Sequence, residues 1–500
     1  MTAPALSIPW AHMMADTALS GLPLQARLRR VVVDAILGGL LPAGSLIPSS
    51  RDLAAVLSIS RNTVTLAYQH LVDEGFLESR PRTGIFVAAQ AQPRSVRASD
   101  PLAGSGGSPP DWAARVLRSQ TKLRTLHKPE RWSDYRYPFV YGTYDPEIFP
   151  AEDFRECCVR TLARSQLARW TPDFETDDVA ELIEQIRKRV LPSRGVFALD
   201  GEIMITIGAQ QAYYLIAETL FKQSTRVGLE EPGHVHARNS FSLREPRFVE
   251  VPVDSQGVVL DNLPELDYLF VTPSHQSPTT VTLSLERRRQ LLHLARTQDF
   301  VLIEDDYEAE NLYAGEPVPA LKSMDRGGRV IYVGSVSKSL SPALRLGFIV
   351  APQTLIRELR AIRHSMLRHP SAFLQHVYAL FLSLGHHDSL TRRVNAAMGE
   401  RLQIATKALG DCLPEFEFTM PAGGASIWVR TPAWVDAAEL AAKCRQLGVL
   451  IESGDVFFGK QPYPCPFFRL RLSSIAANQI EPGILALAQA YRSLASDRGH

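Results

Sequence analysis

Residues 334–347 read Gly-Ser-Val-Ser-Lys-Ser-Leu-Ser-Pro-Ala-Leu-Arg-Leu-Gly and follow an apolar run, 330–333, that predicts a buried strand of an α/β fold. One lysine, Lys338, therefore comes shortly after a strand, with hydroxyl side chains around it and Arg345 seven residues later. A lysine that forms a Schiff base with an aldehyde needs such a fixed position, and hydroxyls together with a guanidinium can hold a phosphate group nearby. The stretch predicts a covalent lysine site at the end of a strand.

A second apolar run, 301–303, is followed after one residue by Asp305-Asp306-Tyr307. Such a strand end suits a pyridine ring, because a carboxylate keeps the ring nitrogen protonated and a phenol can donate to the ring oxygen. We expect Asp305 at the nitrogen, with Asp306 as the close alternative, since neighbouring strand residues point to opposite faces. Tyr307 is expected at the ring oxygen. Together with Lys338, these residues predict a pyridoxal 5'-phosphate (PLP) site.

The phosphate of such a cofactor needs hydrogen-bond donors. Residues 203–212 predict a strand, a glycine turn at Gly208 and the start of a helix, where free backbone N–H groups and the helix dipole favour an anion. We expect Ser335, Ser337 and Arg345 to complete the phosphate site.

The composition divides the chain into four expected regions. These are an N-terminal arm at 1–20, a compact domain at 21–88, a linker rich in Ala, Gln, Pro, Ser and Gly at 89–114, and an α/β domain at 115–500. Strands of the last region are expected at 203–207, 227–229, 248–253, 268–271, 301–303, 330–333 and 346–350. Apolar strands separated by helices predict a mostly parallel sheet that is covered on both faces.

The domain expected at 21–88 has three helical patterns, beginning at residues 24, 52 and 61, and two short strands on either side of a turn at 80–84. This order predicts a winged helix-turn-helix whose third helix enters the major groove. We expect Arg51 and Arg61 to contact phosphates or guanine edges, and Arg80 and Arg82 to reach the DNA from the wing.

Bulk composition limits the alternatives. The chain has 500 residues and a formal net charge of +1, so DNA binding must come from a local basic patch. The five cysteines are odd in number and lack C-x-x-C spacing, which predicts reduced thiols and no metal site. No signal peptide or long apolar span is expected, and these features together predict a cytoplasmic protein.

Three sequence words in the N-terminal region resemble the GntR family of bacterial DNA-binding domains: Leu-Ile-Pro-Ser-Ser-Arg-Asp-Leu-Ala at 46–54, Ser-Arg-Asn-Thr-Val-Thr-Leu-Ala-Tyr at 60–68, and Leu-Val-Asp-Glu-Gly-Phe-Leu at 71–77. The resemblance implies DNA contacts for four residues, Arg51, Arg61, Thr63 and Gly84. The family's usual wing word is Gly-x-Gly-Thr, and this chain has Arg-Thr-Gly-Ile from Arg82 onward.

Five further words occur in the order typical of class I/II aminotransferases: Gly-x-Gln-Gln-Ala, Glu-Pro-Gly, Thr-Pro-Ser-His-Gln-x-Pro-Thr, Glu-Asp-Asp-Tyr and Ser-Lys-Ser-Leu-x-Pro-x-Leu-Arg. Behind a GntR-type domain, they resemble the MocR/GabR subfamily of transcriptional regulators over nearly the whole chain. The resemblance implies a fold-type-I domain with a smaller C-terminal α+β subdomain. It also implies site roles for Lys338 (Schiff base), Asp305 (ring nitrogen), Tyr307 (ring oxygen), and Ser335, Arg345 and the amides of Ala209 and Gln210 (phosphate).

The chain departs from the family pattern at two places. His234 stands where an aromatic residue, usually tyrosine, stacks on the ring; His234 can do so, or His236 can take that face instead. A close-approach glycine is missing after Pro278, and His275 or Gln276 is expected to donate to the ring oxygen.

An arginine near the C-terminus holds the ligand's carboxylate in aminotransferase-like sites, because its planar fork matches a carboxylate. The resemblance puts this role on Arg471, and Arg469 lies two residues earlier on the same strand face.

Three functions stay open at this point. The chain is a PLP-dependent regulator that senses a small amino compound through external aldimine formation at Lys338, a catalytically active aminotransferase with a DNA-binding domain, or a sensor of PLP itself. The fused DNA-binding domain favours a regulator, because an enzyme gains nothing evident from affinity for DNA. The fold type implies a homodimer, which would present two DNA-reading heads to a double-stranded operator.

Overall fold

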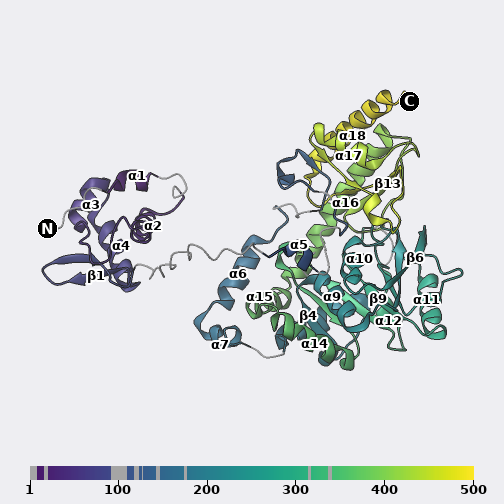
Figure 1. The fold of residues 1–500 in the computed structure, drawn as a ribbon, viewed down its shortest axis with the longest axis horizontal. Helices are drawn as coiled ribbons and strands as arrows, with labels where there is room; N and C mark the ends of the chain where they lie inside the picture. Colours follow the sequence, from purple (N-terminus) through teal and green to yellow (C-terminus); the bar gives the residue numbers. More distant parts are fainter. Residues whose placement is uncertain are drawn as a thin grey trace. The chain divides into compact units, whose positions relative to one another are not determined.

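The computed structural model describes residues 8–15, 21–91, 110–116, 123–126, 128–141, 147–173, 177–313, 317–335 and 340–499. The chain forms two compact units, Met1–Arg118 and Ser119–His500, and each is described by itself (Figure 1). The predicted site residues Lys338 and Ser337 and most of the expected linker lie outside the described residues.

The first unit contains the predicted winged helix-turn-helix. Helices α2 (Leu24–Leu37), α3 (Ser50–Leu57) and α4 (Arg61–Asp73) are followed by the antiparallel strands β1 (Leu77–Arg80) and β2 (Gly84–Val87). Ser49 and Ser60 cap α3 and α4, because their hydroxyls accept hydrogen bonds from backbone N–H groups in the first turn of each helix. Ser58 ends α3 in the left-handed region (φ 54°), which lets α4 begin after a short turn.

The segment expected as an arm contains a short helix, α1 (Trp10–Met14). Trp10 is only 2% exposed and belongs to the same apolar core as Leu28 of α2 and Leu53 of α3. The tryptophan therefore contributes to the packing of the DNA-binding unit.

The second unit is built on an eight-stranded sheet, and all seven strands expected from the sequence are present in it. In spatial order the strands are β4 (Ile203–Thr206), β11 (Gly347–Val350), β10 (Val330–Ser335), β9 (Val301–Asp305), β8 (Tyr268–Val271), β5 (Arg226–Glu231), β6 (Arg247–Asp254) and β7 (Gly257–Val258). Strands β10, β9, β8, β5 and β6 pair parallel, whereas β11 runs antiparallel to both of its neighbours. The mostly parallel sheet is confirmed.

Helices cover both faces of this sheet, because successive strand residues point to opposite sides. Ile303 and Ile331 pack in one cluster with α9 (Gly208–Leu220), α10 (Val235–Ser242) and α14 (Gln353–Leu367). Their neighbours Leu302 and Val330 pack on the other face, in a cluster with α11 (Leu285–Thr297) and α12 (Leu321–Met324). The two residues of each pair thus point to opposite sides, as strand geometry requires. The carboxyl ends of the parallel strands meet at one edge, where polar side chains can gather.

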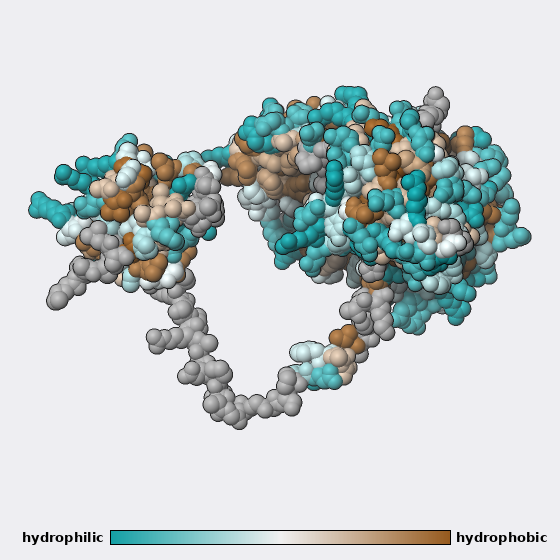
Figure 2. Space-filling model, turned by 90° about the horizontal axis from the view of Figure 1, so that it is seen from above, coloured by the Kyte–Doolittle hydropathy of each residue, from teal (hydrophilic) through white to brown (hydrophobic). Residues whose placement is uncertain are grey.

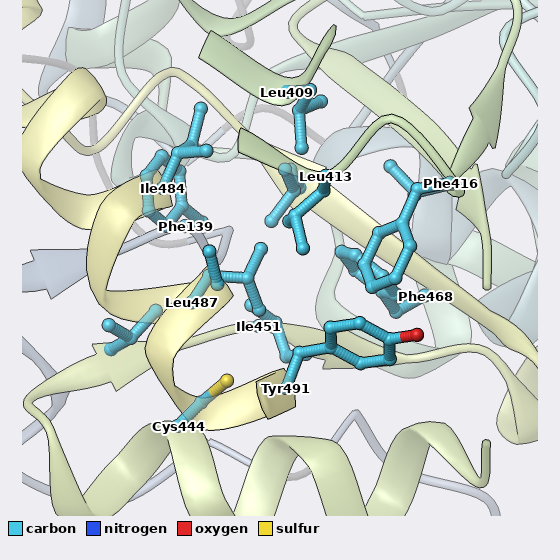
Figure 3. Packing of buried hydrophobic residues seen from close by; sticks show 14 of the residues in the cluster. Phe139, Leu409, Leu413, Phe416, Cys444, Ile451, Phe468, Ile484, Leu487 and Tyr491 are labelled. Atoms are coloured by element: carbon cyan, nitrogen blue, oxygen red, sulfur yellow. The ribbon is translucent and has the colours of Figure 1, made fainter. Parts of the chain in front are cut away.

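A smaller α+β subdomain completes the second unit, as expected. Its antiparallel sheet has the order β12 (Glu417–Phe418), β13 (Ser426–Arg430), β16 (Phe467–Arg471) and β15 (Glu452–Ser453). Helices α16 (His386–Cys412), α17 (Ala437–Gln446) and α18 (Ala477–Asp497) supply most of its apolar core. Figure 3 shows Phe416, Phe468 and Tyr491 in this core. The rings of Phe416 and Tyr491 pack edge to face, with 4.9 Å between their centroids. This core holds β16, and with it Arg469 and Arg471, in a fixed place.

Candidate functional site

An anion cradle forms where α9 begins. Gly208 starts the helix with φ 70°, and a Cβ there would lie 3.5 Å from the guanidinium carbon of Arg345. A Cβ on Gly347 would lie 2.8 Å from the carbonyl carbon of Gly208, so Gly347 is needed for close approach, whereas Gly208 is favoured by its positive φ. Strand pairing puts Ser335 opposite Gly347, and Arg345 Nη2 lies 3.5 Å from Gln210 Oε1. The structure therefore brings together Gly208, Ala209, Gln210, Ser335 and Arg345 around a helix N-terminus, as the phosphate of PLP requires.

Asp305 lies beside this cradle at the end of β9. Its Oδ2 accepts a hydrogen bond of 2.6 Å from the Tyr213 hydroxyl of α9, and the carboxylate is 1% exposed. Burial raises the pKa of Tyr213, and the negative charge of Asp305 adds to the shift, so the phenol keeps its proton as the donor. Tyr213 was missed from the sequence, since nothing in its helix pattern marks it as a partner of a distant aspartate.

Asp306 belongs to a different cluster on the opposite face of the strand. Arg194 Nε donates to Asp306 Oδ2 at 2.8 Å, and the hydroxyls of Tyr332 and Ser274 donate to the same carboxylate. Burial opposes ionisation of Asp306, but the charge and hydrogen bond of Arg194 outweigh it and lower the pKa of the carboxyl. The carboxylate is thus engaged in a buried structural ion pair, which favours Asp305 over Asp306 for the ring nitrogen.

His234 and Tyr307 lie near Asp305. The His234 ring centroid is 5.7 Å from that of Tyr213 and 6.1 Å from that of Tyr307. His234 Nδ1 accepts from the backbone N–H of Ala237 at the start of α10, which leaves the proton on Nε2. His236 is exposed, and its ring centroid lies 5.9 Å from that of His234. Burial raises the pKa of Tyr307, with a further contribution from the neighbouring Glu308.

The expectation for Gln276 needs correction. Its amide nitrogen lies within hydrogen-bond distance of Glu230 Oε2 and donates to the carbonyls of Pro232 (2.8 Å) and Ser277, so it is engaged by the end of β5 as well as by its own loop. His275 is 3% exposed and borders a cavity of about 450 Å³ on the side of Arg194, away from the anion cradle. The turn is closed by a hydrogen bond from the Gln276 N–H to the Val281 carbonyl.

Arg471 and Arg469 are both buried and both paired. Arg471 Nη2 donates to Glu308 Oε1 at 2.7 Å and Nη1 donates to Ser426 Oγ at 3.0 Å. Arg469 Nε donates to Glu452 Oε2 at 2.7 Å. The sequence located both arginines but did not reveal Glu308, whose partner is 163 residues away.

The DNA-facing candidates in the first unit are Arg51, Arg61 and Arg82, all exposed. Arg61 is the first residue of α4, whereas Thr63 takes part in the helix cap through Ser60. Gly84 has φ 124°, a backbone conformation that other residues rarely adopt, so glycine is favoured at this position of the wing; a Cβ there would lie 2.7 Å from Leu46 Cδ1. Arg80 is used within the wing, where it pairs with Glu78 and lies 4.3 Å above the Phe86 ring.

Comparison with known proteins agrees with both units. Residues 163–484 match the family described as aminotransferase class I and II, and residues 24–87 match the bacterial regulatory proteins of the gntR family. The chain is 42% identical to the HTH-type transcriptional regulator TauR of Rhodobacter capsulatus over 94% of this chain and 96% of that protein. It is 31% identical to the probable rhizopine catabolism regulatory protein MocR of Rhizobium meliloti, over 77% and 76% of the two chains.

Solved aminotransferases share the fold of the second unit. The kynurenine aminotransferase of Pyrococcus horikoshii superposes with a TM-score of 0.68 at 27% identity, covering 72% of this chain and 91% of that one. The α-aminoadipate aminotransferase LysN of Thermus thermophilus, in complex with N-(5'-phosphopyridoxyl)-L-leucine, gives 0.68 at 27% identity and covers 77% and 97%.

A GntR-type DNA-binding domain fused to a PLP-dependent class I/II aminotransferase-like domain defines a class of bacterial transcriptional regulators. This chain belongs to that class, the MocR/GabR family. The anion cradle and the Asp305–Tyr213 pair fit PLP, its cofactor. Within the described residues, no helix combines the length and apolarity that crossing a membrane demands.

Proposed function

We propose that this regulator binds an operator through the winged helix-turn-helix and that a small amine carrying a carboxylate changes that binding from the PLP site. The observation that carries the proposal is the position of Arg471 at the end of β16. Its side chain is buried, with only 4% of the residue exposed, and its positive charge acts on the phenol of Tyr307. A carboxylate-binding guanidinium beside a cofactor site is suited to an amino acid or a related compound.

The residues expected around the cofactor each have a role in this proposal. When bound, PLP supplies an aldehyde that condenses with amines, and Lys338 is the lysine that would hold it. The start of α9 and Arg345 would hold the phosphate, and Asp305, anchored by Tyr213, would keep the ring nitrogen protonated. Tyr307 would donate to the ring oxygen, because burial keeps its phenol protonated. His234 would lie against the ring.

The test of this proposal is an absorbance titration of the cofactor-loaded protein with amino acids and amines, followed by DNA-binding measurements with the compounds that change the spectrum. We expect at least one carboxylate-bearing amine to shift the spectrum without consuming the cofactor and to alter affinity for DNA. Conversion to pyridoxamine phosphate that a keto acid reverses would instead identify an aminotransferase. A response of DNA binding to PLP alone would identify a sensor of the cofactor.

The assembly and boundaries are part of the proposal. We infer a homodimer in the cytoplasm, where the operator is, with the DNA-binding domain at 21–88, a linker at 89–114 and the effector domain from 115. The face of the protein in Figure 2 is mostly hydrophilic with separate hydrophobic areas. Phe197 and Leu199 are 84% and 73% exposed, which is consistent with burial in a partner interface. Light scattering on the purified full-length chain measures the mass that decides between monomer and dimer.

If α4 reads the DNA, replacing a residue at its start should lower the affinity for DNA. Arg61→Ala is expected to weaken binding about 10-fold, and to reduce the slope of log affinity against log salt by about 1 if Arg61 contacts a phosphate. The probe is a duplex selected by the wild-type protein from random DNA. Arg30→Ala is the matched control, because Arg30 is exposed on α2 and pairs with Asp34. Equal losses in both variants would contradict a specific role for α4.

A further inference from the structure

The guanidinium expected to receive the ligand's carboxylate already carries a carboxylate of the chain itself. Arg471 and Glu308 form an ion pair of 2.7 Å, and their side chains are 5% and 2% exposed. Glu308 directly follows Tyr307 after the end of β9, with φ 54°. Little water reaches such a pair, so its charges interact much more strongly than those of a surface pair.

Glu308 also joins two parts of the second unit. Its Oε2 accepts from the backbone N–H of Ala425, one residue before β13, at 3.1 Å, while its Oε1 accepts from Arg471 of β16. The carboxylate thus ties the end of the large sheet to two strands of the small sheet. The neighbouring pair of Arg469 and Glu452 does not join the two parts of the unit. These residues face each other on β16 and β15, both inside the small sheet.

The two buried arginines of β16 each have a carboxylate partner before any ligand enters. Arg469 and Arg471 are matched by Glu452 and Glu308, each pair at 2.7 Å. A ligand carboxylate adds one negative charge to a buried site, next to the carboxylate that already holds Arg471. Two carboxylates that contact the same buried guanidinium repel each other. Binding of the ligand's carboxylate therefore favours the departure of Glu308 from Arg471.

We propose that Glu308 is a displaceable internal counter-ion, whose place on Arg471 is taken by the carboxylate of the amine ligand. This inference rests on the proposed function of the site. The release of Glu308 then depends on the ligand, because only a ligand that carries a carboxylate can replace it on Arg471. Its release from Arg471 loosens the tie between the end of β9 and the small sheet, which couples ligand chemistry to the position of the small subdomain.

The test compares two stable cofactor adducts that differ only in the carboxylate, N-(5'-phosphopyridoxyl)-L-alanine and N-(5'-phosphopyridoxyl)-ethylamine. Calorimetry on full-length protein freed of cofactor gives a Kd for each, and their ratio measures the benefit of the carboxylate. Glu308→Gln removes the competing charge while keeping the size of the side chain. We expect the ratio to rise at least ~10-fold in favour of the alanine adduct, with the ethylamine adduct little changed.

Glu417→Gln is the matched control, since Glu417 pairs with Arg430 across the same small sheet but is exposed; its ratio should equal that of wild type. An unchanged or smaller ratio in Glu308→Gln overturns the counter-ion role. Failure of both adducts to bind wild-type protein would overturn the cofactor site itself, and this inference with it.

A structural measurement on wild-type protein avoids any folding defect of the variant. Crystal structures with each adduct should show Glu308 withdrawn from Arg471 beyond hydrogen-bond distance with the alanine adduct, and paired as here with the ethylamine adduct. Retention of the 2.7 Å contact in both complexes overturns the proposal.

Discussion

Replacing Lys338 by alanine is expected to abolish covalent attachment of PLP. The lysine comes three residues after Ser335, the last residue of β10, which pairs with Gly347 beside the Gly208 turn. Loss of its amine would remove the covalent bond expected between chain and cofactor, and would leave the expected phosphate and ring contacts in place. Reductive trapping with borohydride, followed by peptide mass mapping, should find the phosphopyridoxyl group on Lys338 in wild-type protein and none in Lys338→Ala.

Lys322 provides the control for this experiment. Burial lowers the pKa of its amine, which makes it chemically suited to attack an aldehyde. Its Nζ, however, donates to the Val330 carbonyl at the opposite end of β10 from Ser335. Lys322→Ala should therefore trap PLP as wild type does. Trapping on Lys322, or persistence of trapping in Lys338→Ala, would contradict the assignment.

The second large effect separates the two adjacent aspartates. Asp306→Asn is expected to lower the free energy of unfolding of the second unit by about 3–5 kcal/mol, because it leaves the charge of Arg194 buried without a partner. The new amide would also present N–H groups to donors, since Arg194 and Tyr332 both donate to this carboxylate. Urea unfolding followed by fluorescence measures the loss.

Asp305→Asn should behave in the opposite way. The fold should survive, because the neutral Tyr213 hydroxyl can bond an amide as well as a carboxylate. Affinity for PLP should fall about 100-fold, the cost of losing a charge-assisted hydrogen bond to the ring nitrogen. Equilibrium dialysis with PLP gives the affinity. A pattern in which Asp306→Asn loses the cofactor and Asp305→Asn unfolds would reverse our assignment of the two residues.

The helices and strands were largely predictable because their signals are local. Ser60 and the turn after it mark the start of α4, and the apolar run at 301–303 marks β9, so both were located from neighbouring residues alone. The turn at Gly208 followed in the same way, since a strand, a glycine and a helix start are consecutive in the chain. The arm was the exception, because Trp10 is fixed by packing against α2 and α3, which no local pattern reports.

The sequence by itself determined which class of regulator this is and the order of its two domains, and it predicted residues for the cofactor chemistry, Lys338 and Asp305 among them. Only the tertiary structure decided how those residues are used. It separated Asp305 from Asp306 through Tyr213 and Arg194, bound the amide of Gln276 to the Pro232 carbonyl after β5, and paired Glu308 with Arg471. The physical reason is that these roles depend on hydrogen bonds and ion pairs between residues far apart in the chain, whose distances are set by the packing of sheets and helices.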